Sequence, residues 1–480
     1  MAARTAARNL TAISAHKAAQ LAGAFAFAAF IPRRLGPELF GQLAFVISLS
    51  LILQMAGDLG GLDIIGRHVP GWAQQGRPGQ ERIRWLIWQL TWARLGIGLV
   101  MALALALAAP WLAPWLNRWQ GLLIGLGVAL RLLSWTPYHL CFGLNQMGRW
   151  SVEVSWRQLI MIPCLVLGLP WGLTGLLMGL LASEAIFLIP GLLWARPVWR
   201  PTRPDWPGLR PYLRFGTGFF LANILIVLLY RSGPVLLELL THDTVAVGYL
   251  GLALSLYMLV ITVLTQYMAS FTPTLALLHT RQQHAGAQRW LDLLLRYSGI
   301  LMGVLLIGIA LLTFPVAPLL FGADFAAAGP IFLILSLTLL AQPLVWAGRY
   351  AAAAFARPRV ALAAAFAGLS ACTLASLLLI PTLAATGAAL ALGAGVAVMA
   401  ASLIVIGRAW LRPPWPAMLL IFAPLLALLP LLDAARPLLH ALILTAVLVP
   451  AYLLLLWRLR LAPTDELRQA LAAFAGVRGA

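Results

Sequence analysis

The chain has 480 residues, of which 62% are hydrophobic and only 10% are charged. A soluble protein of this length carries about 25% charged residues, so the composition excludes a water-soluble globular protein and indicates that lipid is its solvent. The net charge of +19 does not indicate nucleic acid, because the basic residues stand mostly at the ends of apolar runs, where they contact anionic headgroups.

Apolar runs of about 20 residues, each long enough to cross a bilayer as a helix, recur from end to end. The sequence therefore predicts an all-α, polytopic membrane protein with about fourteen transmembrane helices. No segment between the runs is large enough to form a core of its own. The predicted crossings are residues 12–32, 38–60, 85–109, 120–142, 153–169, 172–195, 212–231, 246–270, 295–315, 328–350, 359–380, 384–407, 414–432 and 438–459.

The distribution of basic residues predicts the orientation. With a cytoplasmic N-terminus, most of the 33 lysines and arginines lie at cytoplasmic ends of the predicted crossings. This bias predicts that both termini are cytoplasmic. The exceptions on the opposite side are Arg33, Arg34, Arg118, Arg231 and Arg436.

A proline-rich segment, residues 197–211, is predicted to be an extended cytoplasmic linker, since its five prolines disfavour a single helix. It separates an N-terminal six-helix lobe, residues 1–196, from a C-terminal six-helix lobe, residues 212–408. Residues 409–461 are predicted to add helices 13 and 14, and residues 462–480 to form a cytoplasmic amphipathic tail.

The two lobes are similar in sequence. GQLAFVISL from Gly41 resembles GYLGLALSL from Gly248, and MGRWSV from Met147 resembles FARPRV from Phe355. PWGLTG and PTLAATG form a third pair, in the same order and at nearly the same offset. These matches predict duplicated lobes, as in many transporters; chance similarity of Leu- and Ala-rich sequence is the alternative.

Four stretches carry a family resemblance. RRLGPELFGQLAFVISLSLILQMAGDLG, AVGYLGLALSL, PLLFGADFAAAGPIFLILSL and IPTLAATGAALALGAG together resemble bacterial polysaccharide (O-antigen type) flippases of the multidrug/oligosaccharidyl-lipid/polysaccharide (MOP) exporter superfamily. The likeness covers residues 8–408, and it lies in the joint order and spacing rather than in one motif. It implies two lobes that rock around a central cavity and a cargo of oligosaccharide on polyprenyl pyrophosphate. Where family members often carry an aspartate beside Arg231, this chain has Ser232, Gly233 and Pro234.

Charges inside predicted crossings are the best indicators of a cargo site, because a charge at the bilayer centre costs at least about 2.5–3.5 kcal/mol unless it faces a cavity or a partner. Arg94 and Arg131 lie inside crossings, and Glu184 lies near the middle of the sixth. Glu184 is the candidate coupling acid, or else it balances one of the arginines. Lys17, one turn into the first crossing, either faces the cavity or snorkels to the surface.

Arg131 begins a stripe with Ser134 and Tyr138. The repeat offset matches Ser134 with Gln342 and Tyr138 with Trp346, which form a second stripe with Arg349. Arginines hold phosphate bidentately, while aromatic rings stack on sugars. We therefore predict substrate binding by these residues, with ordinary interhelical hydrogen bonding as the alternative. Arg33 and Arg34, in the outer turn, either meet departing phosphate or anchor the helix.

Together with these residues, the resemblance implies a flippase, not an enzyme. It would move polyprenyl-pyrophosphate-linked oligosaccharide across a bacterial inner membrane by alternating access through a cationic central cavity. Its expected partners are membrane lipids, the lipid-linked oligosaccharide and a polysaccharide polymerase or assembly proteins, and no nucleic acid. The three cysteines lie in separate apolar segments and show no metal spacing, so no metal or cofactor is expected. The alternatives are a flippase for lipid-linked peptidoglycan precursor and a small-molecule or drug exporter of the same superfamily.

Overall fold

The computed structural model describes residues 2–198, 200–269, 271–426 and 437–461, and all regular structure in these ranges is helical. Side chains are described from residue 18 onward, apart from those at 154, 197, 215, 216, 219, 266, 267, 269, 273, 274 and 280. The predicted all-α fold class is confirmed. The α-helices are α1 Ala2–Gly57, α2 Gly61–Trp72, α3 Gly76–Leu112, α4 Arg118–Gly143, α5 Met147–Gly168, α6 Gly172–Trp194, α7 Trp206–Thr241, α8 Thr244–Ala269, α9 Thr272–Thr280, α10 His284–Phe321, α11 Ala328–Leu337, α12 Gln342–Ala354, α13 Pro358–Gly407, α14 Trp415–Phe422 and α15 Leu438–Arg458.

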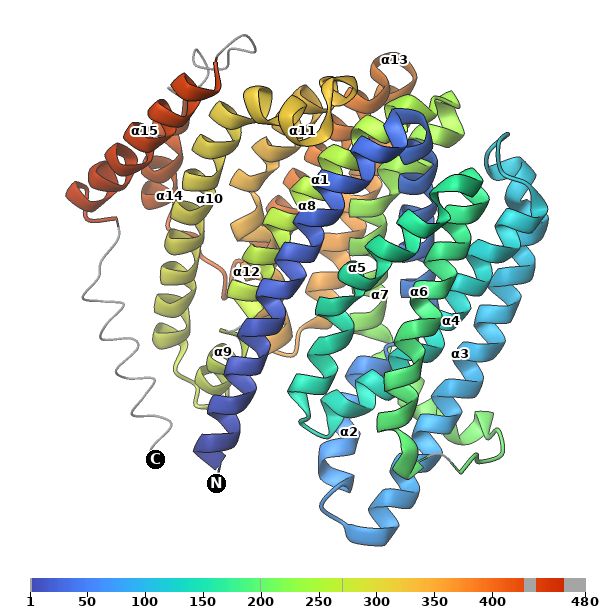
Figure 1. Cartoon of the computed structure of the whole chain (residues 1–480). Coiled ribbons are helices and arrows are strands. Elements are labelled where there is room, and N and C mark those ends of the chain that lie inside the picture. The colour runs from blue at the N-terminus through green and yellow to red at the C-terminus, as the bar shows by residue number, and fades with distance from the viewer. Residues whose placement is uncertain (1, 199, 270, 427–436, 462–480) are drawn as a thin grey trace. The chain divides into compact units, whose positions relative to one another are not determined.

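In the described ranges, nine helices are long and apolar enough to cross a membrane, and the bent pair α11–α12 is a tenth. Three of the nine, Ala18–Gly57, Met147–Trp194 and Pro358–Gly407, have 40, 48 and 50 residues, about twice the length of one crossing. Each has a break near its middle, and Figure 1 shows that α1 reverses direction there. If each of these three helices makes two crossings, the ten become thirteen. The short apolar helix Trp415–Leu426 brings the total to about fourteen crossings, as predicted. The chain is a multi-pass membrane protein.

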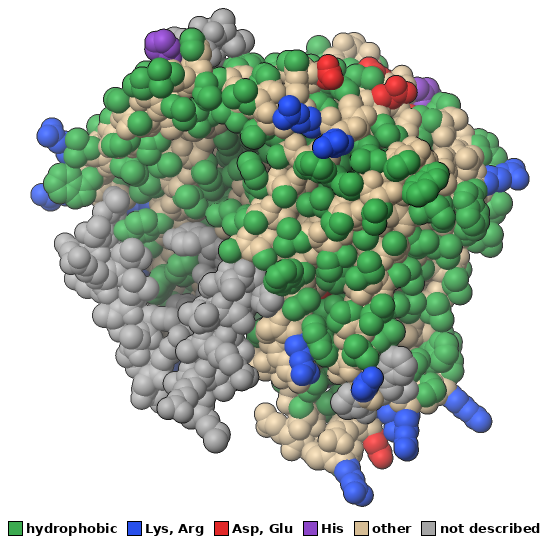
Figure 2. Space-filling view, viewed as in Figure 1, with side chains coloured by type: hydrophobic (Ala, Val, Ile, Leu, Met, Phe, Trp, Pro, Cys, Tyr) green, Lys and Arg blue, Asp and Glu red, His purple; other side chains and the backbone are tan. Residues whose placement is uncertain are grey.

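The outward surface matches this conclusion. Figure 2 shows hydrophobic side chains spread over a broad face, with basic side chains at its margins. Val100 and Leu103 on α3, and Leu374 and Leu378 on α13, are all more than 60% exposed. Soluble proteins rarely expose apolar patches this large, so these faces are in contact with lipid.

The chain divides into two compact units, Met1–Gly251 (unit 1) and Leu252–Ala480 (unit 2), and each is described by itself. Within unit 1, α1 packs against α5 and α7, α3 packs against α4, and α6 packs against α4 and α5. Because α7 packs on α1, this division falls later in the chain than the predicted linker. The two six-helix lobes stay a prediction.

Two glycines that the predicted repeat makes equivalent contact each other, where α1 meets the start of α8. A Cβ atom on Gly41 would collide with the Thr244 carbonyl and lie 2.9 Å from the Gly248 nitrogen. A Cβ atom on Gly248 would collide with the Pro37 carbonyl and lie 3.3 Å from the Gly41 nitrogen. Each glycine thus approaches the backbone next to the other, which is the pattern expected where equivalent residues meet at a two-fold axis. This contact supports the predicted duplication of the lobes.

The third pair of matching motifs also forms equivalent turns. In PWGLTG the chain turns between α5 and α6 at Gly172, which has a φ of 57°. In PTLAATG it bends within α13 at Ala384, which has a φ of 47°. Both residues have the positive φ that lets a helix end and the chain reverse. The two matching segments therefore share a turn geometry as well as a sequence.

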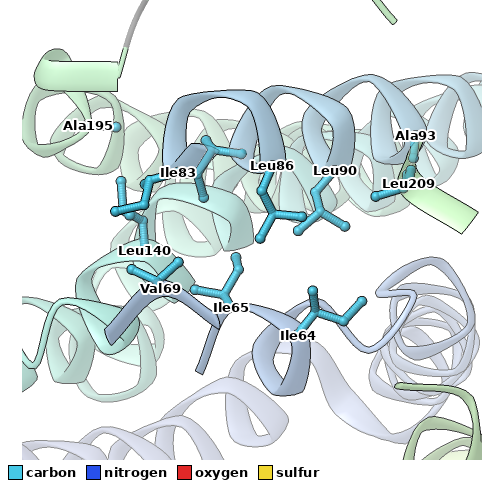
Figure 3. Packing of buried hydrophobic residues seen from close by; sticks show 11 residues of the cluster. Ile64, Ile65, Val69, Ile83, Leu86, Leu90, Ala93, Leu140, Ala195 and Leu209 are labelled. Atoms are coloured by element: carbon cyan, nitrogen blue, oxygen red, sulfur yellow. The ribbon is translucent and has the colours of Figure 1, made fainter. Parts of the chain in front are cut away.

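The short helix α2 is not among the predicted crossings, because its 12 residues cannot span a bilayer. Its residues Ile64, Ile65 and Val69 are fully buried, at the spacing of one helix face. They pack against α3 and α4, including Leu86 and Leu140 (Figure 3). This packing holds the junction between α1 and α2 against α3, where a buried charge cluster forms.

Aromatic rings join α7 to α2 and α3. The Tyr212 ring packs edge-on against His68 at 5.0 Å and lies 6.0 Å from Trp72 and 5.6 Å from Trp85. Burial, together with the neighbouring charge of Arg67, lowers the pKa of His68. The ring is therefore neutral near pH 7, and His68 adds no cation to this part of unit 1.

The segment predicted to be an extended linker lies along α3, where side chains bind its backbone. Trp88 Nε1 donates to the Val198 carbonyl at 2.9 Å, and Trp92 Nε1 donates to the Thr202 carbonyl at 2.9 Å. Since proline has no N–H to donate, a proline-rich segment relies on side chains to satisfy its carbonyls. Part of the linker is thus bound to the surface of α3.

Gln89 of α3 holds the end of this segment. Its side chain is fully buried; Nε2 donates to the Arg203 carbonyl at 2.8 Å, and Oε1 accepts the Asp205 N–H at 2.6 Å. Asp205 in turn caps α7 by accepting the Gly208 N–H at 3.0 Å. The cap starts α7 at Trp206, so the extended part of the linker ends before the predicted residue 211.

Replacing Gln89 by leucine should release this segment. The change leaves the Asp205 N–H and the Arg203 carbonyl unpaired, which costs about 1–3 kcal/mol. Hydrogen exchange followed by mass spectrometry should show at least about tenfold faster exchange at Asp205. Gln80→Leu, at an exposed position of the same helix, is the matched control. Equal protection in both variants would show that Gln89 does not hold the linker.

In unit 2, α10 packs against α11, α14 and α15, and α13 packs against α11 and α12. Tyr452 of α15 is buried among residues of α10 and α14, and its hydroxyl donates to the Ile421 carbonyl at 3.0 Å. A Cβ atom on Gly303 of α10 would collide with that hydroxyl. The C-terminal helices are therefore packed into unit 2 rather than loosely attached.

Candidate functional site

The first buried charge cluster in unit 1 surrounds Arg94, which is fully buried on α3. Its guanidinium pairs with the Asp58 carboxylate, donates to the Thr136 hydroxyl at 2.8 Å and lies 3.3 Å from His139 Nδ1. A Cβ atom on Gly61 would collide with the guanidinium, so this glycine lets α2 begin beside it. The Arg94 cluster, meaning Asp58, Arg94, Thr136 and His139, links the α1–α2 junction to α3 and α4.

The second cluster lies near the middle of α4. Arg131 is only 7% exposed; it pairs with Glu153 of α5, and its Nη1 lies 3.7 Å from Glu184 Oε2 of α6. Arg157 of α5 also pairs with Glu184. The Arg131 guanidinium lies 5.4 Å from the centre of the Trp135 ring. The Arg131 cluster, meaning Arg131, Glu153, Arg157 and Glu184, thus links three helices with two positive and two negative side chains.

Both clusters balance their formal charges, and this revises one inference from the sequence. The predicted cationic cavity rests on counting at least three cations inside the predicted crossings, Arg94 and Arg131 among them, against one clear acid, Glu184. The structure adds Asp58 beside Arg94 and Glu153 beside Arg131. Both guanidinium groups are occupied by protein carboxylates, so a cationic cavity can no longer be inferred from these two arginines. The predicted alternative for Glu184, an ion pair with an arginine, matches the geometry.

The neutral residues predicted on the α4 stripe are also engaged inside unit 1. Ser134 and Tyr138 are fully buried. The Ser134 hydroxyl donates to the Arg131 carbonyl at 2.9 Å, and the Tyr138 hydroxyl donates to the Phe187 carbonyl of α6 at 3.1 Å. The Tyr138 contact is the interhelical hydrogen bonding that the sequence left as the alternative, whereas the Ser134 bond stays within α4. Substrate binding by Ser134 and Tyr138 stays a prediction.

In unit 2, Gln342 takes part in a hydrogen-bonded chain. Gln342 Nε2 donates to the Tyr257 hydroxyl at 2.6 Å, and that hydroxyl lies 2.5 Å from Thr338 Oγ1. Because Thr338 Oγ1 donates to the Leu335 carbonyl at 2.7 Å, Tyr257 is the donor to Thr338. The fully buried Gln342 and Tyr257 thereby join α8 to the region between α11 and α12.

The helix break in this region is a feature that the sequence did not predict. The apolar segments Ala328–Leu340 and Gln342–Ala354 meet at an angle of 50°, although residues 328–350 were expected to be one helix. Thr338–Leu340 forms a 3₁₀ turn, and Pro343 follows at the start of α12, where a proline is tolerated. Broken helices are typical of substrate sites in transporters.

Just beyond this break, Arg349 lies against aromatic rings. Its guanidinium is 5.4 Å from the centre of the Trp346 ring and 5.3 Å from that of Tyr350. Such stacking holds a guanidinium in place. Arg349 and Trp346 thus lie together on α12, and their role in substrate binding stays a prediction.

The remaining predicted site residues lie on α1. Arg33 and Arg34 are exposed beside the kink at Gly36, and the Arg34 guanidinium lies 5.2 Å from the centre of the Phe30 ring. This exposure is compatible with either of their two predicted roles. The Lys17 side chain is outside the described residues, and its role stays a prediction.

Glu238 of α7 is a buried acid that the sequence analysis did not select. It is fully buried; Trp115 Nε1 donates to its Oε1 at 2.8 Å, and Oε2 has no hydrogen-bond partner among the described atoms. The Trp115 ring packs edge-on against Phe45 of α1. The feature of the sequence that could have identified Glu238 is that it is an isolated acid close to Arg231. Nothing in the sequence indicated that Trp115 would contact it.

Comparison with known proteins decides the family. A family model described as "Polysaccharide biosynthesis protein" matches residues 7–279, which is more than half of the chain. The chain belongs to the polysaccharide biosynthesis protein family. The resemblance expected from the sequence is thereby confirmed. No curated protein sequence matches this family member.

Solved structures place this family member in the MOP fold. A "Lipid II flippase MurJ, inward closed conformation" is 14% identical, with a TM-score of 0.72 over 94% of this chain and 98% of that one. An inward-facing multidrug resistance MATE family transporter of the MOP superfamily is 14% identical, with a TM-score of 0.65 over 82% and 94%. A MATE transporter of Vibrio cholerae is 15% identical, with a TM-score of 0.51 over 85% and 98%. At these identities the likeness shows the fold alone.

Proposed function

We propose that the protein is a flippase that moves oligosaccharide linked to polyprenyl pyrophosphate across the bacterial inner membrane. The observation that carries the proposal is the family match over residues 7–279 on a chain that is a multi-pass membrane protein with a transporter fold. A membrane transporter that takes part in polysaccharide biosynthesis has a lipid-linked sugar as its natural cargo. No catalytic step is part of the proposal.

The geometry supports the following roles for individual residues within this proposal. Arg349 and Trp346 bind the pyrophosphate and a sugar ring, because they join a cation to an aromatic face beside the α11–α12 break. The Arg94 and Arg131 clusters hold the helices of unit 1 together, so that these helices move as one rigid part during alternating access. Both termini lie in the cytoplasm, and a polysaccharide polymerase or assembly protein receives the product on the outer side.

Deleting the gene should abolish the cell-surface polysaccharide and cause lipid-linked oligosaccharide to accumulate in the inner leaflet. The reason is that a charged headgroup cannot cross the hydrocarbon core unaided. Polysaccharide on intact cells and lipid-linked intermediates in membrane extracts are measured with and without a plasmid-borne copy. Arg349→Ala should reduce rescue at least about tenfold at normal protein level, while Arg408→Ala, an exposed arginine of the same unit, should rescue fully.

Two results would contradict the proposal. Unchanged surface polysaccharide together with increased drug sensitivity would indicate an exporter of small molecules. Accumulated peptidoglycan precursor with cell lysis would indicate a lipid II flippase, the second candidate. That candidate is favoured by the wider match of the MurJ structure, which covers 94% of this chain against 82% and 85% for the two MATE structures.

A further inference from the structure

A pocket of about 400 Å³ lies in unit 2, and none of the residues that line it belongs to the two charge clusters or to the α11–α12 break. Its walls come from α9, the first turns of α10, the connection between α12 and α13, and the connection between α13 and α14. A volume of this size is in the range of small-molecule sites. The pocket is therefore large enough for a phosphate group and part of the molecule that carries it.

The lining of this pocket is basic. His279, His284, Arg357 and Arg412 contribute to it, and none of the described residues that line it is acidic. Neither arginine forms an ion pair within the described part of the chain. The contrast with Arg94 and Arg131 is direct, since those arginines are occupied by carboxylates. Two arginines without a carboxylate partner at the edge of one pocket attract an anion.

The position of Arg412 is fixed by the protein. Gln288 of α10 donates from Nε2 to the Arg412 carbonyl at 2.8 Å and to Asp292 Oδ1 at 2.7 Å. The arginine backbone is thus held against the start of α10, while its side chain is exposed. That start is the positive end of a 38-residue helix, and Gln283 at its N-cap makes no side-chain cap hydrogen bond. The helix end adds to the positive potential of the two arginines.

Aromatic rings form the apolar part of the same pocket. The His279 ring lies 4.7 Å from that of Phe355, and the Trp410 ring packs edge-on against Phe355 at 5.5 Å. Trp410 Nε1 is buried and has no hydrogen-bond acceptor among the described atoms. A buried donor without an acceptor is unfavourable, and an oxygen atom of a bound ligand would satisfy it. The pocket therefore combines cations, a spare donor and flat apolar surfaces.

We propose that this pocket binds the phosphate group of an anionic ligand. Two sources share that chemistry: the headgroup of an anionic membrane phospholipid, and a soluble phosphate compound. Under the predicted topology, the connections that form the pocket lie at the cytoplasmic surface, where both sources are within reach. The proposal does not depend on which cargo the protein carries.

The test uses purified full-length protein in detergent, in two arms. In the first arm, sodium pyrophosphate is titrated against sodium chloride at equal ionic strength and binding is measured by calorimetry. In the second arm, phosphatidylglycerol is titrated against phosphatidylcholine and bound lipid is counted by native mass spectrometry. The pocket variant is Arg357→Gln with Arg412→Gln. Its matched control is Arg281→Gln with Arg408→Gln, two exposed arginines of neighbouring segments outside the pocket lining.

Binding in at least one arm should be about tenfold weaker for the pocket variant than for the control, and the arm that shows the loss identifies the source. Equal binding by the two variants in both arms would overturn the proposal, and so would an absence of binding by the unmodified protein. If the pocket variant does not purify, the two single substitutions replace it. Trp410→Phe, which removes only the spare donor, should then weaken binding to a smaller extent.

Discussion

Replacing Arg131 by methionine should destabilise the protein by about 3–5 kcal/mol, the usual cost of removing one partner from a buried ion pair. Glu184 keeps Arg157 as a partner, but Glu153 loses the guanidinium with which it pairs. Glu153 is only 5% exposed, so water cannot replace that guanidinium. The measurement is the amount of folded protein in the membrane and its thermal midpoint in detergent.

A paired substitution separates folding from transport. Arg131→Met with Glu153→Gln removes both charges, and it should recover most of the lost stability because no unpaired charge remains. Transport that returns with stability would assign the Arg131 cluster to packing within unit 1. A stable paired variant without transport would support the predicted role of Arg131 in binding cargo. A single Arg131→Met variant as stable as the unmodified protein would contradict the ion pair itself.

The fold was predictable because apolar run length is a local property. A run of about 20 apolar residues must cross the bilayer whatever its neighbours are, and the recurrence of such runs predicts about fourteen crossings. The turns were also readable, since Gly36 and Pro37 interrupt the first long run and the first half of α1 ends there. The repeat was readable from Gly41 and Gly248, which contact each other in unit 1.

The partners of the buried side chains were not predictable in the same way. Arg94 hydrogen-bonds to Asp58, 36 positions away, and to Thr136, 42 positions away. Gln89 binds the Arg203 carbonyl, 114 positions away. The sequence shows that such polar residues lie within apolar helices, but only helix packing selects which of them meet. An inference about net charge in a cavity therefore fails when it counts charges along the chain rather than in space.

Replacing Arg94 by lysine should destabilise the protein, although less than replacing it by alanine, which leaves the Asp58 carboxylate without its partner. Lysine keeps the positive charge, but its single ammonium cannot reproduce the planar fork that contacts Asp58, Thr136 and His139 together. Removing two of these contacts costs roughly 1–3 kcal/mol. The loss should destabilise the packing of the α1–α2 junction against α3. Arg82→Lys, at an exposed position of the same helix, should leave stability unchanged.

Thermal midpoint and transport per folded molecule, measured on the same preparations, decide between the two roles of Arg94. If the arginine links helices, the lysine variant should lose stability first, and Thr136→Val, which removes one contact, should show a smaller loss of about 1 kcal/mol. If the arginine binds cargo, a lysine should still attract phosphate, so the variant should keep its stability and change its transport. The fully buried position of Arg94 favours the helix-linking role. A guanidinium that is already paired with a carboxylate binds a second anion only weakly.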